Sequence, residues 1–330
     1  MGPQDLILEI GTAYWKSEVL FTAFDLDIFG ILDKEGLSAA DLADRIGADR
    51  DGLERLLLAL RALGLLACDK DRYTIPEALS PCLPPGGGRS LSPFLTHMAH
   101  IRERWARLGD AVKSGSPLEF GGTDDHAMAE EQTDAFMAAM EGLASNLADS
   151  LVAAFPLRGD EAILDLGCGP GTFVRRFLER YPGVRATLVD VEDVIPITER
   201  HMEKEGQLDR VALISGDLRH VSLREGSYDV VLLSNVMHIF GPEEVSTIFK
   251  KIYSALRPGG SFLVNDFFTD PTGTRPAWGA LFSLNMLIHT EGGRNYRLDE
   301  GEVFLREARF SDIYSRGLSA HATLLVGHKS

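Results

Sequence analysis

The sequence predicts an α/β protein whose larger part is a doubly wound parallel sheet, and three observations support this fold class. An apolar run at residues 163–166 ends in a turn with glycines at Gly167, Gly169 and Gly171, and a helical pattern follows. Further apolar runs then alternate with helical patterns. The second run ends in Asp190, at about the 20-residue spacing found in nucleotide-binding βαβ units. We therefore expect a nucleotide-like ligand at the carboxyl edge of the sheet.

The glycine turn is weak evidence by itself, because GxGxG also occurs in plain tight turns. Glycine allows positive φ and leaves no Cβ to hold a ligand away from the backbone. The third glycine comes one residue earlier than in the nicotinamide fingerprint GxGxxG. The later apolar runs, at residues 210–217, 228–235 and 255–266, supply the further strands that a doubly wound sheet needs. Two more strands are expected in the C-terminal tail.

Composition limits the classes of partner. The chain has 330 residues and a formal net charge of −16, which disfavours nucleic acid as a partner because its phosphates require a basic surface. Its three cysteines, Cys68, Cys82 and Cys168, have no disulfide or zinc-like spacing. We see no signal peptide and no apolar run long enough for a membrane span. We expect a cytoplasmic protein with no metal site and no membrane partner.

The N-terminal part reads as a mostly α-helical winged helix. Residues 5–32 have the apolar spacing of a helix, and Ser38 and Asp49 are expected to cap the next two helices. Residues 65–80 then read as a two-stranded wing. DNA binding would need a basic recognition helix, whereas the candidate helix is mostly apolar with mixed charges. The first helix is apolar on more than one face, which favours the alternative of dimerisation.

Three regions are expected along the chain. Residues 1–85 form the winged-helix domain, because the Pro- and Gly-rich segment PCLPPGGG marks a connection after it. Residues 86–150 read as connecting helices, and residues 151–330 form the doubly wound domain. In the long helix before residue 155, Phe136, Met137 and Met140 lie at helical spacing, a pattern that usually means core packing.

Taken together, several segments resemble class I S-adenosylmethionine (SAM) methyltransferases: DLGCGPG, Asp190, the GD at 216–217, NVMH ending at His238, and RPGG before the fifth strand. Residues 42–66, LADRIGADRDGLERLLLALRALGLL, are similar to the front of the small-molecule O-methyltransferases with an N-terminal winged-helix dimerisation domain. The resemblance covers nearly the whole chain from about residue 10. It implies a Rossmann-like sheet, a homodimer, SAM as cofactor, and methyl transfer to a hydroxyl of an aromatic or polyketide-like small molecule.

The resemblance also implies site residues, each of which has ordinary packing as its alternative. The positions implied in SAM binding are Asp165, Gly167, Gly169, Gly171, Asp190, Val191, Gly216, Asp217, Leu218, Ser234 and Met140. Those implied in lining the acceptor pocket are Phe136, Met137, Asn285, Met286 and His289. Asp165 would lie near the amino group of the methionine moiety, Asp190 at the ribose, and Met140 near the sulfonium. Cys168 is expected only to fill the tight turn.

His238 is the candidate general base, because its ordinary pKa of about 6.5 suits proton removal at neutral pH. Three departures from the family pattern surround it. Ile239 replaces an Asp, Phe240 replaces a Trp, and Asn295 replaces the Glu that orients the imidazole. Asn295 can accept a hydrogen bond from the ring but adds no charge, and Glu291 could substitute for the missing carboxylate. These departures keep C-methylation and a non-methylating SAM-binding relative open as alternatives, beside a SAM-responsive DNA-binding regulator.

Overall fold

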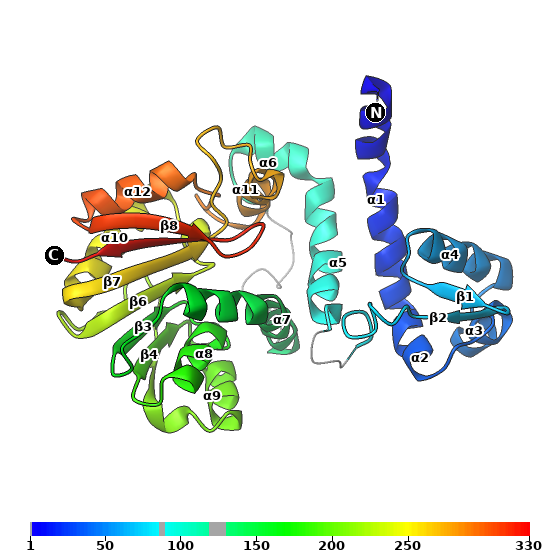
Figure 1. Ribbon diagram of the computed structural model, residues 1–330. Coiled ribbons are helices and arrows are strands. Elements are labelled where there is room, and N and C mark those ends of the chain that lie inside the picture. Colours follow the sequence, from blue (N-terminus) through cyan, green and yellow to red (C-terminus); the bar gives the residue numbers. More distant parts are fainter. Residues whose placement is uncertain (1, 86–89, 119–129) are drawn as a thin grey trace. The chain divides into compact units, whose positions relative to one another are not determined.

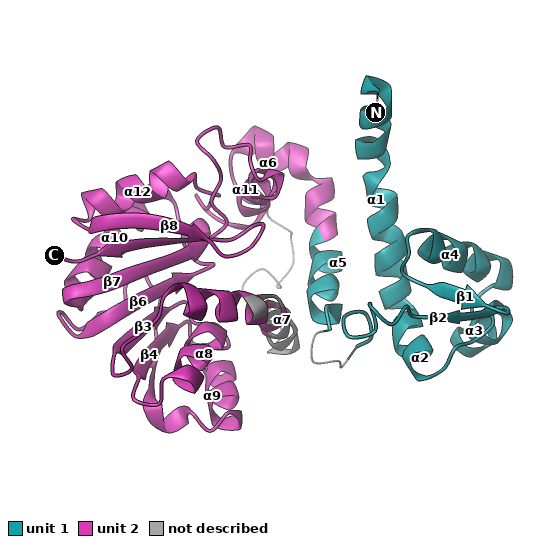
Figure 2. Ribbon diagram, in the orientation of Figure 1, with its two compact units in different colours: residues 1–101 teal, residues 102–330 magenta. Residues whose placement is uncertain are grey.

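A computed structural model of the chain describes residues 2–85, 90–118 and 130–330 (Figure 1). The side chains of residues 130–136, 138, 139, 143 and 146 lie outside this description. The chain divides into two compact units, residues 1–101 and 102–330 (Figure 2). The expected domain boundaries at residues 85 and 150 stay predictions. None of the helices in the described ranges is long and apolar enough to cross a membrane.

The first unit has the winged-helix pattern. Its elements are α1 (Pro3–Asp25), α2 (Ile28–Lys34), α3 (Ala39–Ile46), α4 (Arg50–Ala62), β1 (Ala67–Asp69) and β2 (Arg72–Thr74). The predicted caps are confirmed, since Ser38 accepts a hydrogen bond from the Asp41 amide and Asp49 accepts one from the Gly52 amide. β1 and β2 pair antiparallel and form the expected wing.

The prediction of one helix over residues 5–32 was wrong, because two helices meet at Asp27. Asp27 has a φ of 50°, in the left-handed region that ends a right-handed helix. The change of direction lets Ile28 and Phe29 enter the core of the first unit, where both are fully buried. The gain from burying these side chains, about 1.5–3 kcal/mol each, favours the break over one continuous helix.

α1 carries an apolar surface that its own unit does not cover. Side chains along its first four turns are 48–70% exposed: Leu6, Ile7, Leu8, Ile10, Tyr14 and Trp15. An exposed apolar patch of this kind marks a site of association. The exposure agrees with the sequence-based expectation that this helix needs a partner.

The second unit is built on a seven-stranded sheet. Its strands are β3 (Ala162–Leu166), β4 (Arg185–Asp190), β5 (Val211–Ser215), β6 (Tyr228–Ser234), β7 (Leu256–Asp266), β8 (Ser311–Gly317) and β9 (Thr323–His328). The strand order is β5-β4-β3-β6-β7-β9-β8. The five strands from β3 to β7 are parallel, and β9 pairs antiparallel with both β7 and β8. The doubly wound sheet and the two strands in the tail are thereby confirmed.

Helices cover both faces of this sheet. The helices that follow the wing in the chain are α5 (Ser92–Ala106), which crosses the boundary between the units, α6 (Leu108–Ser114), α7 (Glu130–Ala154), α8 (Thr172–Arg180), α9 (Ile195–Lys204), α10 (Pro242–Ala255), α11 (Ala277–His289) and α12 (Leu298–Glu307), with short 3-10 helices η1 (Leu208–Arg210) and η2 (Met237–Ile239). Alternate strand residues face opposite layers. Ile163 packs in the cluster formed with α7 and α8, whereas Leu164 packs in the cluster formed with α10 and α12.

The order of the strands reverses at the pair β3 and β6, which lie side by side although β4 and β5 come between them in sequence. Crevices at such a reversal, outside the carboxyl ends of the strands, are where open α/β sheets bind ligands. The glycine turn follows β3, and the segment with His238 follows β6. The fold therefore places the two strongest sequence signals at one edge.

We expect Gly171→Ala to destabilise the second unit more than Gly259→Ala does. Both glycines have a φ between 74° and 78°. Both variants thus carry the left-handed strain of about 1–2 kcal/mol. At Gly171 the new Cβ would also lie 2.2 Å from Cε of Met202, whereas nothing lies within 4 Å at Gly259. Because the end of the flexible Met202 side chain can move aside in part, urea unfolding should show a further loss of about 1 kcal/mol for Gly171→Ala. Equal losses would contradict the close packing of the turn.

Candidate functional site

The glycine turn connects β3 to α8 in a strained path that only glycine follows easily. Gly167, Gly169 and Gly171 have φ values of 70°, 53° and 74°. A Cβ on Gly167 would lie 2.5 Å from Cγ2 of Val236, in the segment after β6. The nearest atom to a Cβ on Gly169 would be Sδ of Met137, at 3.7 Å. The turn is therefore packed between the end of β6 and α7.

Asp190, at the end of β4, holds the glycine turn with its carboxylate. One oxygen accepts a hydrogen bond from the Gly169 amide at 2.7 Å, and the other accepts one from the Val191 amide at 2.8 Å. Burial raises the pKa of Asp190, and these two hydrogen bonds oppose the rise. A carboxylate has about four acceptor positions, so two remain for hydroxyl groups of a ligand. Val191 is exposed beside it.

Asp165, in β3, is a buried carboxyl with an unsatisfied oxygen. Its Oδ2 has no hydrogen-bond partner among the described residues. Burial, with a smaller contribution from the charge of Asp190, raises the pKa of Asp165 to about 8. Such a group is costly in the absence of a partner. It fits a ligand that brings a cationic or hydrogen-bond-donating group to the edge of β3.

The residues after β5 and β6 border the same edge. Gly216 donates its amide to the Asp190 carbonyl at 2.8 Å. The carboxylate of Asp217 pairs with Arg219, which lowers the pKa of Asp217 to about 2. Leu218 is buried, and the hydroxyl of Ser234 accepts a hydrogen bond from the Asn265 amide group at 2.7 Å.

His238 lies in η2, directly after β6, and its ring is held by Asp266. Nδ1 of His238 is 2.7 Å from Oδ1 of Asp266, the last residue of the neighbouring strand β7. Both side chains are buried. Asp266 in turn accepts hydrogen bonds from the amides of Phe267 and His238. With Nδ1 engaged by the carboxylate, Nε2 is the nitrogen free to accept a proton.

Sequence reasoning missed Asp266, although it lies 28 residues after His238 at the end of a predicted strand. Two expected residues, Asn295 and Glu291, are placed differently. Asn295 is buried, and its Nδ2 has no partner among the described residues. Glu291 is exposed. In the part of the chain that the structure describes, neither side chain hydrogen-bonds the His238 ring. Their catalytic roles stay predictions.

Two aromatic side chains contact the imidazole, and further rings pack behind them. The ring of His238 stacks on Phe267, with centroids 5.8 Å apart, and meets Phe282 of α11 edge-on at 4.8 Å. Trp278 stacks on Phe282, and His321 lies against Trp278. Planar rings of this kind favour contact with flat, apolar ligands.

α11 also carries the positions expected to contact an acceptor. The side-chain oxygen of Asn285 accepts a hydrogen bond from Nε1 of Trp105 at 3.0 Å. His289 donates from Nδ1 to the Asn285 carbonyl, and burial lowers the pKa of His289. Met286 is buried. On α7, Met137 and Met140 are half-buried, whereas the side chain of Phe136 lies outside the described residues.

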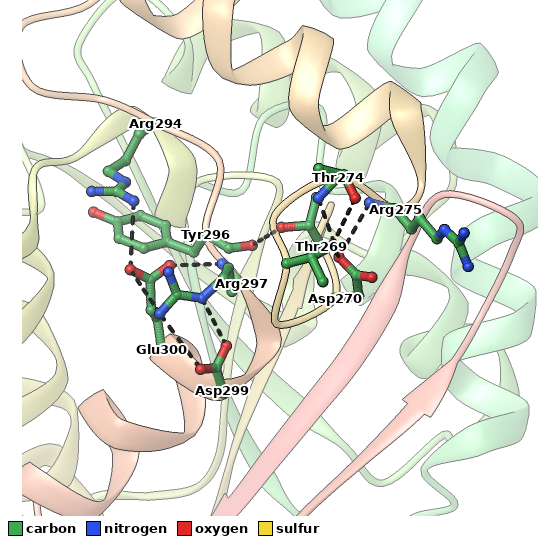
Figure 3. Close-up of polar contacts among 10 residues, drawn as sticks. Thr269, Asp270, Thr274, Arg275, Arg294, Tyr296, Arg297, Asp299 and Glu300 are labelled. Atoms are coloured by element: carbon green, nitrogen blue, oxygen red, sulfur yellow. Dashed lines mark hydrogen bonds and ion pairs between the residues drawn. The ribbon is translucent and has the colours of Figure 1, made fainter.

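The segments around α11 are fixed by a polar network beyond Asp266 (Figure 3). Thr269 donates its amide to the Tyr296 carbonyl at 3.0 Å. The carboxylate of Asp270 accepts from the amides of Thr274 and Arg275, which closes the loop that leads into α11. Glu300 accepts from the Arg297 amide and lies 3.4 Å from Arg294. The hydrogen bonds to Asp270 anchor the loop before α11, the helix that carries Phe282.

Two further expectations concern cysteine and metals. Cys168 is buried in the glycine turn, and burial raises the pKa of its thiol, which disfavours the reactive thiolate. Within residues 2–85, 90–118 and 130–330, no group of three His, Cys, Asp or Glu side chains is arranged to hold a metal ion.

Comparison with known proteins gives two matching family models. The O-methyltransferase domain matches residues 105–311, more than half of the chain, and the O-methyltransferase dimerisation domain matches residues 8–79. The tetracenomycin polyketide synthesis 8-O-methyltransferase TcmO of Streptomyces glaucescens is 30% identical, with 99% of this chain and 97% of the relative covered. The 3-hydroxy-5-methyl-1-naphthoate 3-O-methyltransferase of Streptomyces sahachiroi is 28% identical, over 93% of this chain and 90% of the relative.

A solved structure resembles the whole chain. The crystal structure of human N-acetylserotonin methyltransferase in complex with SAM has a TM-score of 0.88 and 26% identity, and the match covers 100% of both chains.

The Asp165 carboxyl makes stability depend on pH. In the folded protein it keeps its proton up to about pH 8, whereas in the unfolded chain it ionises near pH 4. The unfolded state therefore binds fewer protons in this window, and the free energy of unfolding falls as pH rises from about 4 to 8. Asp165→Asn removes this effect, so its stability relative to wild type should rise from pH 5 to pH 8 in urea unfolding.

Asp217→Asn is the matched control for this prediction. The pKa of Asp217 is lowered to about 2. The ionised carboxylate therefore stabilises the folded state fully above about pH 4, and this stabilisation is lost only as the pH falls further. The stability difference between Asp217→Asn and wild type should be flat from pH 5 to pH 8. A flat difference for Asp165→Asn as well would contradict a protonated Asp165.

Proposed function

Because the chain belongs to the O-methyltransferase family, we propose that it transfers a methyl group from SAM to a hydroxyl of an aromatic or polyketide-like small molecule. The family is SAM-dependent, and the glycine turn with its acidic neighbours fits such a cofactor. The observation that carries the proposal is the buried pair of His238 and Asp266 at the same sheet edge as that turn. The relatives that act on polyketide and naphthoate hydroxyls support the substrate class.

The cofactor would be held by residues from three strand ends. The unsatisfied carboxyl of Asp165 suits an α-ammonium group, whose positive charge would lower the pKa of Asp165 and favour its ionised form. The free acceptor positions of Asp190 suit ribose hydroxyls. Val191 and Leu218 offer apolar surface for a purine ring. Bound SAM supplies an electrophilic methyl group and a neutral thioether leaving group.

His238 acts as the general base in this proposal. Nε2 takes the proton of the acceptor hydroxyl, while Asp266 keeps the ring oriented and stabilises the imidazolium that forms. The carboxylate therefore supplies the charge that Asn295 lacks. Phe267 and Phe282 fix the plane of the imidazole and exclude water from one side of it.

We expect His238→Ala to lower kcat for a phenolic acceptor by about 10²-fold or more, because a positioned base contributes at least that much. S-adenosylhomocysteine (SAH) should bind this variant as it binds wild type in calorimetric titration. His328→Ala is the matched control. In the wild type the His328 ring shares a hydrogen bond with Ser261, far from the strand ends that form the site. Turnover of this variant should therefore not change. A fully active His238→Ala enzyme would argue against the base and favour C-methylation or a non-methylating relative.

Two alternative functions are weaker candidates than methyl transfer to a hydroxyl. Ile239 and Asn295 motivate the second candidate, C-methylation or a SAM-binding relative without methyl transfer, because a carbon nucleophile needs less help from a base. A SAM-responsive DNA-binding regulator is the weakest candidate, since the chain carries a net charge of −16.

We also propose that the chain forms a homodimer through its N-terminal unit, with the apolar side chains of α1 at the interface. Ile7→Glu with Ile10→Glu places charges on this surface and should shift the mass measured by light scattering from dimer to monomer. Leu58→Glu, at an exposed position on α4, is the control and should leave the mass unchanged. A dimer that survives both charges would exclude α1 from the interface.

A further inference from the structure

Three side chains from three helices meet beside the glycine turn, outside the residues discussed so far. Glu141 of α7 accepts a hydrogen bond from the guanidinium of Arg175, in α8. His201 of α9 places Nδ1 3.3 Å from the second oxygen of Glu141 and 3.2 Å from Nη1 of Arg175. The Arg175 side chain is only 11% exposed. This group, which we call the three-helix cluster, ties α7 to both neighbouring helices.

The members from α7 and α8 lie one helical turn from the glycine turn. Met137, four residues before Glu141, places its sulfur 3.7 Å from the position of a Cβ on Gly169. Arg175 itself donates its backbone amide to the carbonyl of Gly171 at 2.9 Å. A shift of α7 along α8 would therefore move Met137 over the turn.

His201, the member of the three-helix cluster on α9, also lies one helical turn from a residue that contacts the glycine turn. Thr198, three residues before His201, donates its hydroxyl to the carbonyl of Gly169 at 2.6 Å. Residues three or four apart share one face of a helix, so Thr198 and His201 face the same side. α9 thus contacts the glycine turn through Thr198, and it contacts α7 through His201, one helical turn further along.

We propose that Glu141, Arg175 and His201 are positioning residues for SAM, which set the distance between α7 and the glycine turn. The Glu141 side chain is 26% exposed and that of Arg175 11%, so this ion pair is partly withdrawn from water. Such a pair is a poor source of stability, because apolar residues of similar volume often stabilise as well or better. Its directional hydrogen bonds instead fix how two helices lie against each other. His201 and Arg175 lower the pKa of Glu141 to about 2, so Glu141 is ionised at any pH at which the protein would be assayed.

The test compares two ion pairs that join the same two helices. Glu141→Gln breaks the partly buried pair, and Asp149→Asn breaks the more exposed pair between Asp149 and Arg176, whose atoms are 3.3 Å apart. Calorimetric titration should give a Kd for SAH about tenfold higher for Glu141→Gln, because the pre-organised pocket is lost. KM for SAM should rise with it, while kcat at saturating SAM stays near wild type. Asp149→Asn should bind SAH as wild type does.

A second variant separates positioning from stability. Glu141→Leu combined with Arg175→Met replaces the pair by apolar side chains and is expected to restore or keep the free energy of unfolding. The hydrogen bonds among Glu141, Arg175 and His201 are absent from this variant, so it should bind SAH weakly. This result tests the proposal even if Glu141→Gln does not fold. A wild-type Kd in the apolar variant, or an equal loss of affinity in Asp149→Asn, would overturn the proposal.

Discussion

The parallel pairing of β3 with β6 is the constraint on which the site depends. Leu166 lies opposite Leu233 in this register, so both strands end at the same level. The glycine turn and the segment with His238 are then forced together, and Val236 packs where Gly167 lacks a Cβ. A change of register by one residue would turn the buried side chains of β3 to the opposite face of the sheet. The two core clusters therefore fix the geometry of the site.

Four carboxyl groups lie at the carboxyl edge of the sheet, and each has different hydrogen-bond partners. Asp190 is satisfied by backbone amides, Asp266 by the imidazole, and Asp217 by Arg219. Asp165 alone among these four has an oxygen without a partner in the described part of the chain. The free acceptor positions of Asp190 and Asp165 suit a ligand that brings both hydroxyls and positive charge, which agrees with the proposed sites for the ribose and methionine moieties of SAM.

Local patterns predicted most of the fold, because caps, glycine turns and strand ends are encoded within a few residues. Ser38, Asp49 and the glycine turn are examples. The partnership of His238 with Asp266 was missed because it arises from pairing between β6 and β7, which no local pattern reports. The break at Asp27 was missed for a related reason: a non-glycine residue took a left-handed conformation to bury its neighbours. Whether Asn295 reaches the imidazole depends on the path of a loop, which residue types alone do not fix.

The close approach of Val236 to Gly167 joins the glycine turn and the segment with His238 into one packed unit. A Cβ at position 167 or a larger side chain at position 236 would push these two segments apart, so a substitution at either position displaces both of them. Phe282 of α11 meets the imidazole from a separate element, which has its own anchoring loop. A substitution on α11 can therefore change the surroundings of the His238 ring without altering the packing of Val236 against Gly167.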